Sequence, residues 1–205
     1  MKLYSINLTA IPDGWRLFSI RKADKKFLPF KQKILERDNY ICRFCGIPTR
    51  KHHEIINLDN NYRNNKVQNL VTACRFCSQC YFLDAIGNGE ARSGELIYLP
   101  ELSQKDLNAM CHVLFRAMFY ESHRYSTTAW STYNLFKSRK EIIEKRLGEG
   151  MSDASYFGRL LLDISDSDRR KVEQNLLPFI RLLPIYEEFI DIIADLSGAL
   201  GESIF

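Results

Sequence analysis

Four of the six cysteines form two Cys-x-x-Cys pairs, and no other feature restricts the fold of this chain as strongly. The pairs are separated by 28 residues, somewhat more than is common in four-cysteine zinc sites. Each pair can direct two thiolates to one side of a tight turn, and two such turns complete a tetrahedron around zinc. We therefore expect one structural Zn²⁺ per chain, held by Cys42, Cys45, Cys74 and Cys77. With four protein ligands, such an ion has no open position at which to activate water.

Cys80 and Cys111 are the remaining cysteines, and Cys77-x-x-Cys80 is a second possible pair. We favour Cys74 with Cys77, because Cys80 begins the apolar run CYFLDAIG, which fits a buried helix. Free cysteine is commonly buried as a small apolar residue. Cys80 and Cys111 are therefore predicted to be core residues rather than metal ligands.

The cellular compartment bears on the chemistry of these cysteines. The chain has no apolar run of the roughly 18 to 20 residues that a membrane span needs, and its N-terminus lacks the residue order of a signal peptide. These features predict a cytoplasmic protein with no direct membrane insertion. In such a reducing compartment, Cys-x-x-Cys pairs indicate metal or redox chemistry more often than disulfides.

The formal net charge of +4 is divided unevenly along the chain. Residues 1–100 contain 16 Lys and Arg against 9 Asp and Glu, whereas residues 101–205 contain 13 against 16. A basic N-terminal half can attract nucleic acid or an acidic protein surface. Its basic stretch RKADKKFLPFKQK is equally consistent with a solvated helix face.

Residue patterns predict an α+β fold with two parts. Alternation of apolar and polar residues on both sides of Pro12-Asp13-Gly14 predicts an N-terminal β-hairpin. Apolar residues at helical spacing predict a helix from about Asp24 to Asp38, which leads into the first cysteine pair. The stretch GNGEARSGELIYLPELS shows neither spacing and marks a boundary. We expect residues 1–99 to contain the hairpin, the helix and a zinc module, and residues 100–205 to form a helical region.

The helical region has clear start and stop signals. Ser103 followed by Asp106 predicts a helix start of the capping-box type. Pro178 and Pro184 lack amide donors, so they should divide the last apolar region rather than lie within one straight helix. Further helices are expected between these two points.

Aromatic residues are frequent in this region, and each can serve the core or a partner interface. We favour the core for all of them. They are Phe115, Phe119, Tyr120, Trp130, Tyr133 and Phe136. His112 and His123 lie about three turns apart on a continuous helix, too far to share a metal, and both are interpreted as structural.

The order Cys-x-x-Cys, His52-His53, Asn69-Leu70, Cys-x-x-Cys resembles the zinc-containing HNH endonuclease family over about residues 37–86. The resemblance implies a ββα zinc module. It also implies that His52 would bind a catalytic metal ion, that His53 would be the general base, and that Asn69 would hold the loop. In that family, a His or Asn after the last cysteine pair supplies another metal ligand.

Ser78 stands at that last position and departs from the family pattern. A hard catalytic ion is held by few protein ligands, so replacing one of them with a neutral hydroxyl removes much of the site. We therefore predict a degenerate HNH module with no catalytic residues and no enzymatic activity. His52 and His53 are then expected to be hairpin residues that hydrogen-bond nearby backbone.

The whole chain, from MKLYSINLTAIPDGW through the zinc segment to the helical region, resembles the DotN (IcmJ) family of the Dot/Icm type IVB secretion system. The resemblance implies a non-catalytic adaptor of the cytoplasmic coupling complex, placed at the inner membrane through that complex. It implies binding to the C-terminal extension of a DotL-like coupling ATPase and to other coupling-complex subunits, and a role in effector secretion and virulence. The alternative is an HNH-type metal-dependent DNA endonuclease, and a third, weaker hypothesis is DNA binding without cleavage. Nucleic acid is not the expected partner.

Overall fold

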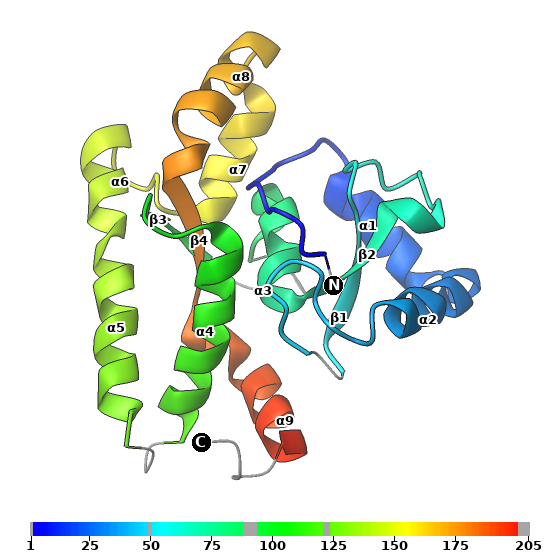
Figure 1. Ribbon diagram of the computed structural model, residues 1–205. Helices are drawn as coiled ribbons and strands as arrows, with labels where there is room; N and C mark the ends of the chain where they lie inside the picture. The colour runs from blue at the N-terminus through cyan, green and yellow to red at the C-terminus, as the bar shows by residue number, and fades with distance from the viewer. Residues whose placement is uncertain (1, 49–50, 88–93, 121–123, 201–205) are drawn as a thin grey trace.

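A computed structural model describes residues 2–48, 51–87, 94–120 and 124–200 (Figure 1). The helices are α1 (Gly14–Ala23), α2 (Leu28–Arg37), α3 (Arg75–Ser78), α4 (Gln104–Phe119), α5 (Ser126–Ser138), α6 (Lys140–Leu147), α7 (Ala154–Asp163), α8 (Asp166–Asn175) and α9 (Ile190–Leu200). The strands are β1 (His53–Asn57), β2 (Leu70–Cys74), β3 (Gly94–Tyr98) and β4 (Ile180–Pro184). These elements confirm the α+β class.

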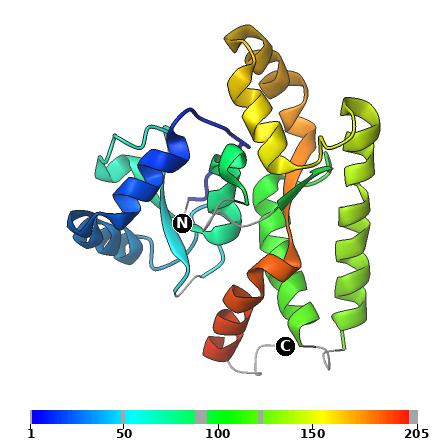
Figure 2. The ribbon, with the colours of Figure 1, turned by 180° about the vertical axis from the view of Figure 1, so that it is seen from behind.

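The strands form two separate antiparallel pairs. β1 pairs with β2, with His53 opposite Cys74. β3 pairs with β4, with Gly94 opposite Pro184. The first pair lies with α1 and α2 in one part of the molecule, and the second lies among the later helices (Figure 2). α3 contacts α4 and so joins the two parts.

The stretch around Pro12 does not form the β-hairpin predicted for it. Residues 2–11 have no regular secondary structure, and α1 begins at Gly14. The alternating pattern nevertheless reports burial, because Ile6 and Leu8 are buried while their neighbours Ser5 and Asn7 are exposed. Asp13 adopts a left-handed conformation with φ of 61°, which turns the chain into a helix instead of a second strand. The antiparallel hairpin of the N-terminal half is β1–β2.

The helix predicted between Asp24 and Asp38 is present. It begins as a 3₁₀ turn, η1 (Lys25–Phe27), and continues as α2. Ile34 and Leu35 are buried in a small cluster that includes residues of both β1 and β2. α2 therefore covers one side of the first strand pair.

The stretch between Gly87 and Pro100 contains β3, which was not predicted. Its partner β4 lies beyond the expected boundary, near the end of the chain. Pro178 lies in a 3₁₀ turn, η5 (Leu177–Phe179), and Pro184 is the last residue of β4, so the prolines divide this region as predicted. The predicted helix start is confirmed, because the Ser103 Oγ accepts a hydrogen bond from the Asp106 backbone N–H.

The main core extends through both parts of the molecule. Phe115 of α4 links its helices: the ring contacts Phe76 of α3 and Tyr133 of α5, with centroids 5.4 and 5.3 Å apart. Phe115, Tyr133 and Phe136 are buried, which confirms the core interpretation for these three aromatics. Among the helices of the described ranges, none has the length and apolar character needed to cross a membrane.

Candidate metal centre

The first cysteine pair lies in a tight turn after α2. Within it, the Cys42 N–H donates to the Ile47 carbonyl at 3.0 Å, and the Gly46 N–H donates to the Cys42 carbonyl at 3.0 Å. Gly46 has a φ of 78°, a left-handed conformation that glycine adopts without the steric cost of a Cβ. A β-bridge between Ile41 and Pro48 closes the turn. This turn is the first knuckle.

The second cysteine pair lies where a strand becomes a helix. Cys74 is the last residue of β2, and Cys77 lies in α3. The first knuckle is bound to this strand, because the Arg43 backbone N–H donates to the Thr72 carbonyl at 2.8 Å. The β2–α3 turn is the second knuckle, and the hydrogen bond sets it beside the first.

Asp38 is a buried carboxylate that joins the same two segments through its side chain. It accepts from the Arg43 guanidinium at 2.8 Å and from the Thr72 backbone N–H at 2.9 Å. Arg37 also donates to it, at 2.9 Å. Burial acts to raise the pKa of Asp38, but the hydrogen bonds from Arg37 and Thr72 hold that pKa below its ordinary value. The ionised carboxylate thus holds the first knuckle against β2.

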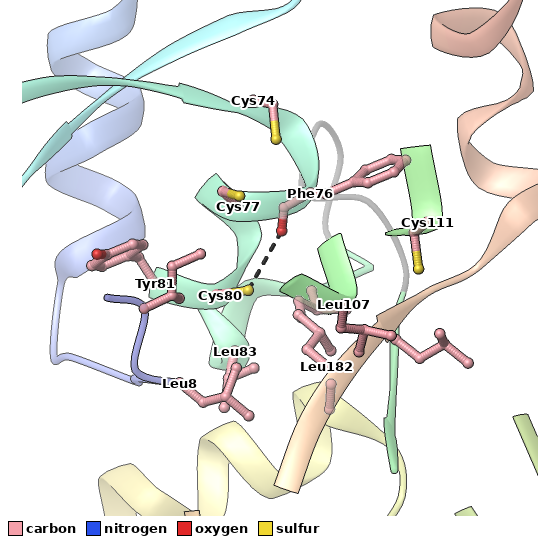
Figure 3. Packing of buried hydrophobic residues seen from close by; sticks show 14 of the residues in the cluster. Leu8, Cys74, Phe76, Cys77, Cys80, Tyr81, Leu83, Leu107, Cys111 and Leu182 are labelled. Carbon is pink, nitrogen blue, oxygen red and sulfur yellow. Dashed lines mark hydrogen bonds between the residues drawn. The ribbon is translucent and has the colours of Figure 1, made fainter. Parts of the chain in front are cut away.

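The four predicted ligand atoms come together at these knuckles. The Sγ atoms of Cys42, Cys45, Cys74 and Cys77 all lie within 4.8 Å of one another. The Sγ atoms of Cys45 and Cys74 are 3.7 Å apart, and a tetrahedron with Zn–S bonds of about 2.3 Å requires about 3.8 Å. Cys45 is half-buried and the other three are buried. The cluster, of which Figure 3 shows Cys74 and Cys77, is compatible with a structural metal ion.

The electrostatics of the cluster fit a bound cation. Burial raises the pKa of both Cys74 and Cys77, which opposes ionisation of these thiols in the absence of a cation. Hydrogen bonds from neighbouring thiols, that of Cys42 first, lower the pKa of Cys45. A coordinating cation deprotonates a thiol outright and so allows all four to be thiolates. A tetrahedral set of four sulfur ligands suits zinc or an iron–sulfur centre rather than a hard cation.

The two remaining cysteines lie outside the sulfur cluster. Cys80 and Cys111 are both 0% exposed. The Cys80 thiol donates to the Phe76 carbonyl at 3.4 Å, as Figure 3 shows, and Cys111 lies on α4. Their prediction as core residues is confirmed.

Helix α4 brings two polar side chains to the cluster, and neither contact was predicted from the sequence. Asn108 Nδ2 lies 3.3 Å from Cys77 Sγ, and His112 Nε2 lies 3.3 Å from Cys74 Sγ. Being four residues apart, they share one face of the helix. Their spacing predicts a shared helix face, but it does not indicate that this face meets the cysteines. His123, which we considered together with His112, lies outside the described residues.

The paired histidines have different surroundings. His52 Nε2 lies 2.9 Å from the Asp195 carboxylate of α9, so its partner is a distant side chain rather than the nearby backbone that was predicted. His53 is 5% exposed and its ring lies against Tyr40, with centroids 5.6 Å apart. Its Nε2 is buried and has no hydrogen-bond partner within the described part of the chain. Burial lowers the pKa of His53 to about 4, which keeps the ring neutral near pH 7.

The connection between β1 and β2 is ordered by asparagine side chains. Asn69 Nδ2 donates to Asp59 Oδ1 at 2.7 Å, and Asn69 Oδ1 accepts from the Asp59 N–H at 3.0 Å. Asn57 Nδ2 donates to the carbonyls of Asn61 and Asn64 at 2.9 and 2.8 Å. These contacts hold the loop in the manner that the resemblance implies for Asn69.

Ser78 has a backbone partner of its own. It is 6% exposed, and its hydroxyl donates to the Arg75 carbonyl one turn earlier, at 3.2 Å. A hydroxyl used in this way has a satisfied hydrogen bond inside α3. The Ser78 hydroxyl therefore has a structural role within α3.

Comparison with known proteins identifies a similar protein. No family model matches the chain. The chain is 46% identical over 184 residues to the type 4 apparatus protein DotN of Legionella pneumophila subsp. pneumophila strain Philadelphia 1. The match covers 90% of this chain and 85% of that protein. It therefore includes residues of both the cysteine region and the helical region.

Proposed function

The chain belongs to the family of the type 4 apparatus protein DotN, and on this premise we propose that it is a non-catalytic, zinc-stabilised adaptor of a type IVB secretion coupling complex. As a DotN homologue it is a component of a type IV secretion apparatus. In our proposal it binds the C-terminal extension of a DotL-like coupling ATPase and supports effector translocation from the inner face of the membrane. The observation that carries this proposal is 46% identity over 90% of the chain.

The zinc part of the proposal is supported by the sulfur cluster. Cys42 and Cys45 come from the first knuckle, and Cys74 and Cys77 from the second. An ion bound by all four would cross-link the turn after α2 to the end of the β1–β2 hairpin. Four sulfur ligands leave no position for water or substrate, so the ion would stabilise the fold and take no part in catalysis.

The non-catalytic part is supported by the three positions at which an HNH nuclease carries its chemistry. His53 Nε2 is enclosed in protein, whereas a general base must come within hydrogen-bond reach of the water that it activates. His52 is engaged with Asp195. The Ser78 hydroxyl is engaged with backbone. These contacts favour a scaffold over an active centre.

Co-purification tests the partner. The full chain, expressed with the C-terminal extension of the cognate coupling ATPase, should form a complex that survives size-exclusion chromatography. The same sample should contain one zinc ion per chain by elemental analysis. Absence of a complex under conditions in which both components are folded would refute the adaptor function.

A nuclease assay tests the alternative. We expect no cleavage of plasmid DNA with Mg²⁺, Mn²⁺ or added Zn²⁺. Metal-dependent cleavage that disappears in His53→Ala would establish the nuclease instead. DNA affinity that falls steeply with rising salt, without cleavage, would establish the third hypothesis, because phosphate contacts release counterions.

A further inference from the structure

We propose that Asn108 and His112 of α4 donate hydrogen bonds to the metal-bound thiolates of Cys77 and Cys74, and that α4 thereby controls how firmly the metal is retained. This inference rests on the zinc of the proposed function and is independent of the ATPase. It assigns an outer layer of the metal centre to a helix that begins only at Gln104, beyond β3 and well after the last ligand in the sequence. The centre would then depend on both parts of the molecule.

A buried chain of amides fixes the orientation of Asn108. Gln104 is bound to both main-chain groups of Leu182 in β4: its Oε1 accepts from the N–H and its Nε2 donates to the carbonyl, each at 2.8 Å. The same Nε2 lies 3.0 Å from Asn108 Oδ1 and donates to it. Because the amide oxygen of Asn108 faces Gln104, its Nδ2 faces the second knuckle.

At the knuckle, Asn108 Nδ2 lies close to three acceptors, the farthest of which is Cys80 Sγ at 3.9 Å. It lies 3.2 Å from the Phe76 carbonyl and 3.3 Å from Cys77 Sγ. Asn108 is 0% exposed, and a buried amide costs free energy unless its hydrogen bonds are made. The two N–H groups of the amide match the two nearer acceptors, the Phe76 carbonyl and Cys77 Sγ. The amide does not titrate, so the side chain keeps its N–H donors facing Cys77 Sγ at any pH.

His112 approaches the second sulfur from the next turn of α4. Its ring stacks on Phe76, with centroids 4.1 Å apart and planes inclined by 22°, and its Nε2 lies 3.3 Å from Cys74 Sγ. Phe76 lies between the two cysteines of the second knuckle, so the stacking holds the imidazole over that knuckle. A metal-bound thiolate carries no proton, and Nε2 must therefore be the donor in the metal-bound protein.

The proposed N–H···S hydrogen bonds would stabilise the negative charge of the thiolates. Four thiolates around one dication carry excess negative charge, which is costly in a buried site unless hydrogen-bond donors face the sulfur atoms. Outer-layer partners of this kind typically change metal affinity by about 10- to 100-fold. Since coupling between sites is reciprocal, α4 should hold the metal and the metal should hold α4.

Zinc release to a chelator tests the inference. Asn108→Leu removes the amide at similar size, and His112→Phe keeps the ring on Phe76 while removing the N–H donor. We expect release from the full chain to be faster by about 10-fold or more in Asn108→Leu, and by a smaller factor in His112→Phe. His112→Gln, which retains an N–H donor, should recover part of the loss. Cys111→Ala, at a buried position on the same helix outside the sulfur cluster, should release zinc at the wild-type rate.

Cobalt substitution separates hydrogen bonding from loss of folding. N–H···S bonds withdraw electron density from sulfur, so their loss should move the thiolate-to-Co²⁺ charge-transfer absorption to lower energy. Asn108→Leu and His112→Phe should show this shift, and Cys111→Ala should not. If Asn108→Leu does not fold, His112→Phe decides the question, because this position is only half-buried.

Two results overturn the inference in distinguishable ways. Wild-type release rates and absorption in both variants would refute the role of α4 while leaving the zinc proposal intact. A wild-type chain that takes up neither zinc nor cobalt would refute both.

Discussion

The two antiparallel strand pairs are similarly buried but are held together differently. β1 and β2 are joined by the loop of residues 58–69, whereas the much longer stretch of residues 99–179 separates β3 from β4. The first pair is closed by the asparagine loop and, in our proposal, by the metal. The second is enclosed by α4, α5, α6 and α7, which pack against its strands. Helices α2 and α3 also pack against the first pair, so the two pairs differ mainly in their local connection and in the proposed cross-link.

The longer connection between β3 and β4 adds little to the free-energy cost of loop closure. Each doubling of the length of a closed loop adds only about 0.6 kcal/mol of closure free energy. The longer connection amounts to fewer than three doublings of the shorter one, so its additional cost is below about 2 kcal/mol. Burying one large apolar side chain contributes about 1.5–3 kcal/mol. Burial of side chains between the helices and β3 and β4 therefore offsets the free-energy cost of the longer loop. We expect that substitutions can destabilise each strand pair separately.

The largest effect is expected from Cys74→Ser, which removes one of the four sulfur ligands. Because structural zinc contributes directly to folding free energy, the chain should lose its zinc and several kcal/mol of stability. Amide hydrogen exchange should accelerate throughout β1 and β2 and much less in β3 and β4. Cys111→Ser, at the buried cysteine outside the cluster, should keep one zinc per chain. Retention of zinc by Cys74→Ser would contradict the proposed role of the metal. Equal loss of amide exchange protection in both strand pairs would contradict their separate stabilisation.

The next largest effect is expected at Gly158, where α7 packs against the 3₁₀ turn η4 (Leu83–Ala85). A Cβ at this position would meet the backbone of Leu83 and Asp84, with the Leu83 carbonyl carbon only 2.5 Å away. Backbone atoms cannot rotate aside, so Gly158→Ala should destabilise the protein by about 3 kcal/mol. α7 also contacts β3, so protection should fall in the second pair.

Chemical denaturation and zinc analysis check this prediction together. Gly158→Ala should keep its zinc, in contrast to Cys74→Ser. The matched control is Arg159→Ala at the next residue of α7. Arg159 is exposed, so this substitution should have little effect on the denaturation midpoint. Unchanged stability in Gly158→Ala would show that the close packing of α7 on η4 is not required for stability.

Local spacing explains what could be predicted from the sequence. Each Cys-x-x-Cys pair and the Ser103 helix start depend on residues a few positions apart, and the structure contains both features. The predicted hairpin at Pro12 failed because alternation reports one-sided burial and not a hydrogen-bonded partner. Ile6 and Leu8 are buried in a segment without regular secondary structure, which pairs with no strand in the described ranges.

Non-local contacts explain what could not be predicted. β3 is a short segment after a stretch rich in Gly and Ser, and its partner β4 follows only after the helices α4 to α8, which periodicity cannot reveal. Asn108 and His112 present the same difficulty at the metal centre. Their spacing indicates a shared helix face, but only the packing of α4 against α3 shows that sulfur atoms lie opposite that face.

A smaller effect is expected at Tyr133, which holds the end of β4. Its hydroxyl donates to the Pro184 carbonyl and accepts from the Tyr186 N–H, both at 3.1 Å, and the side chain is 1% exposed. Tyr133→Phe leaves both backbone groups without this partner and should cost about 2 kcal/mol in denaturant unfolding. Tyr156→Phe, at an exposed tyrosine, should cost almost nothing. A zinc content that changed with Tyr133→Phe would mean that the two pairs are not separable.

The smallest effect concerns the outer edge of β3. The Leu96 N–H of this strand donates to the Ser152 carbonyl at 2.8 Å, so the loop after α6 lies along the strand. Glu144 of α6 holds that loop by accepting from the Ser152 N–H at 2.8 Å and from the Gly150 N–H. Glu144→Gln keeps the size of the side chain but removes the charge, and its cost at pH 7 should be below about 1 kcal/mol because solvent screens an accessible carboxylate.

The pH dependence of this small difference distinguishes the charge from the shape of the side chain. Hydrogen bonds from Ser152, followed by that from Gly150, hold the pKa of Glu144 below its ordinary value of 4.5. A carboxyl group with a lowered folded-state pKa stabilises the protein above the unfolded-state pKa, and this contribution disappears as the pH falls through the folded-state value. The stability difference between wild type and Glu144→Gln should therefore be constant from pH 7 to about pH 5 and shrink below pH 4.5. Because the two proteins are compared at each pH, protonation of the cysteine cluster affects both equally and cancels. A difference that stayed constant below pH 4 would mean that the loop depends on the shape of residue 144, and that the edge of β3 needs no charge to hold it.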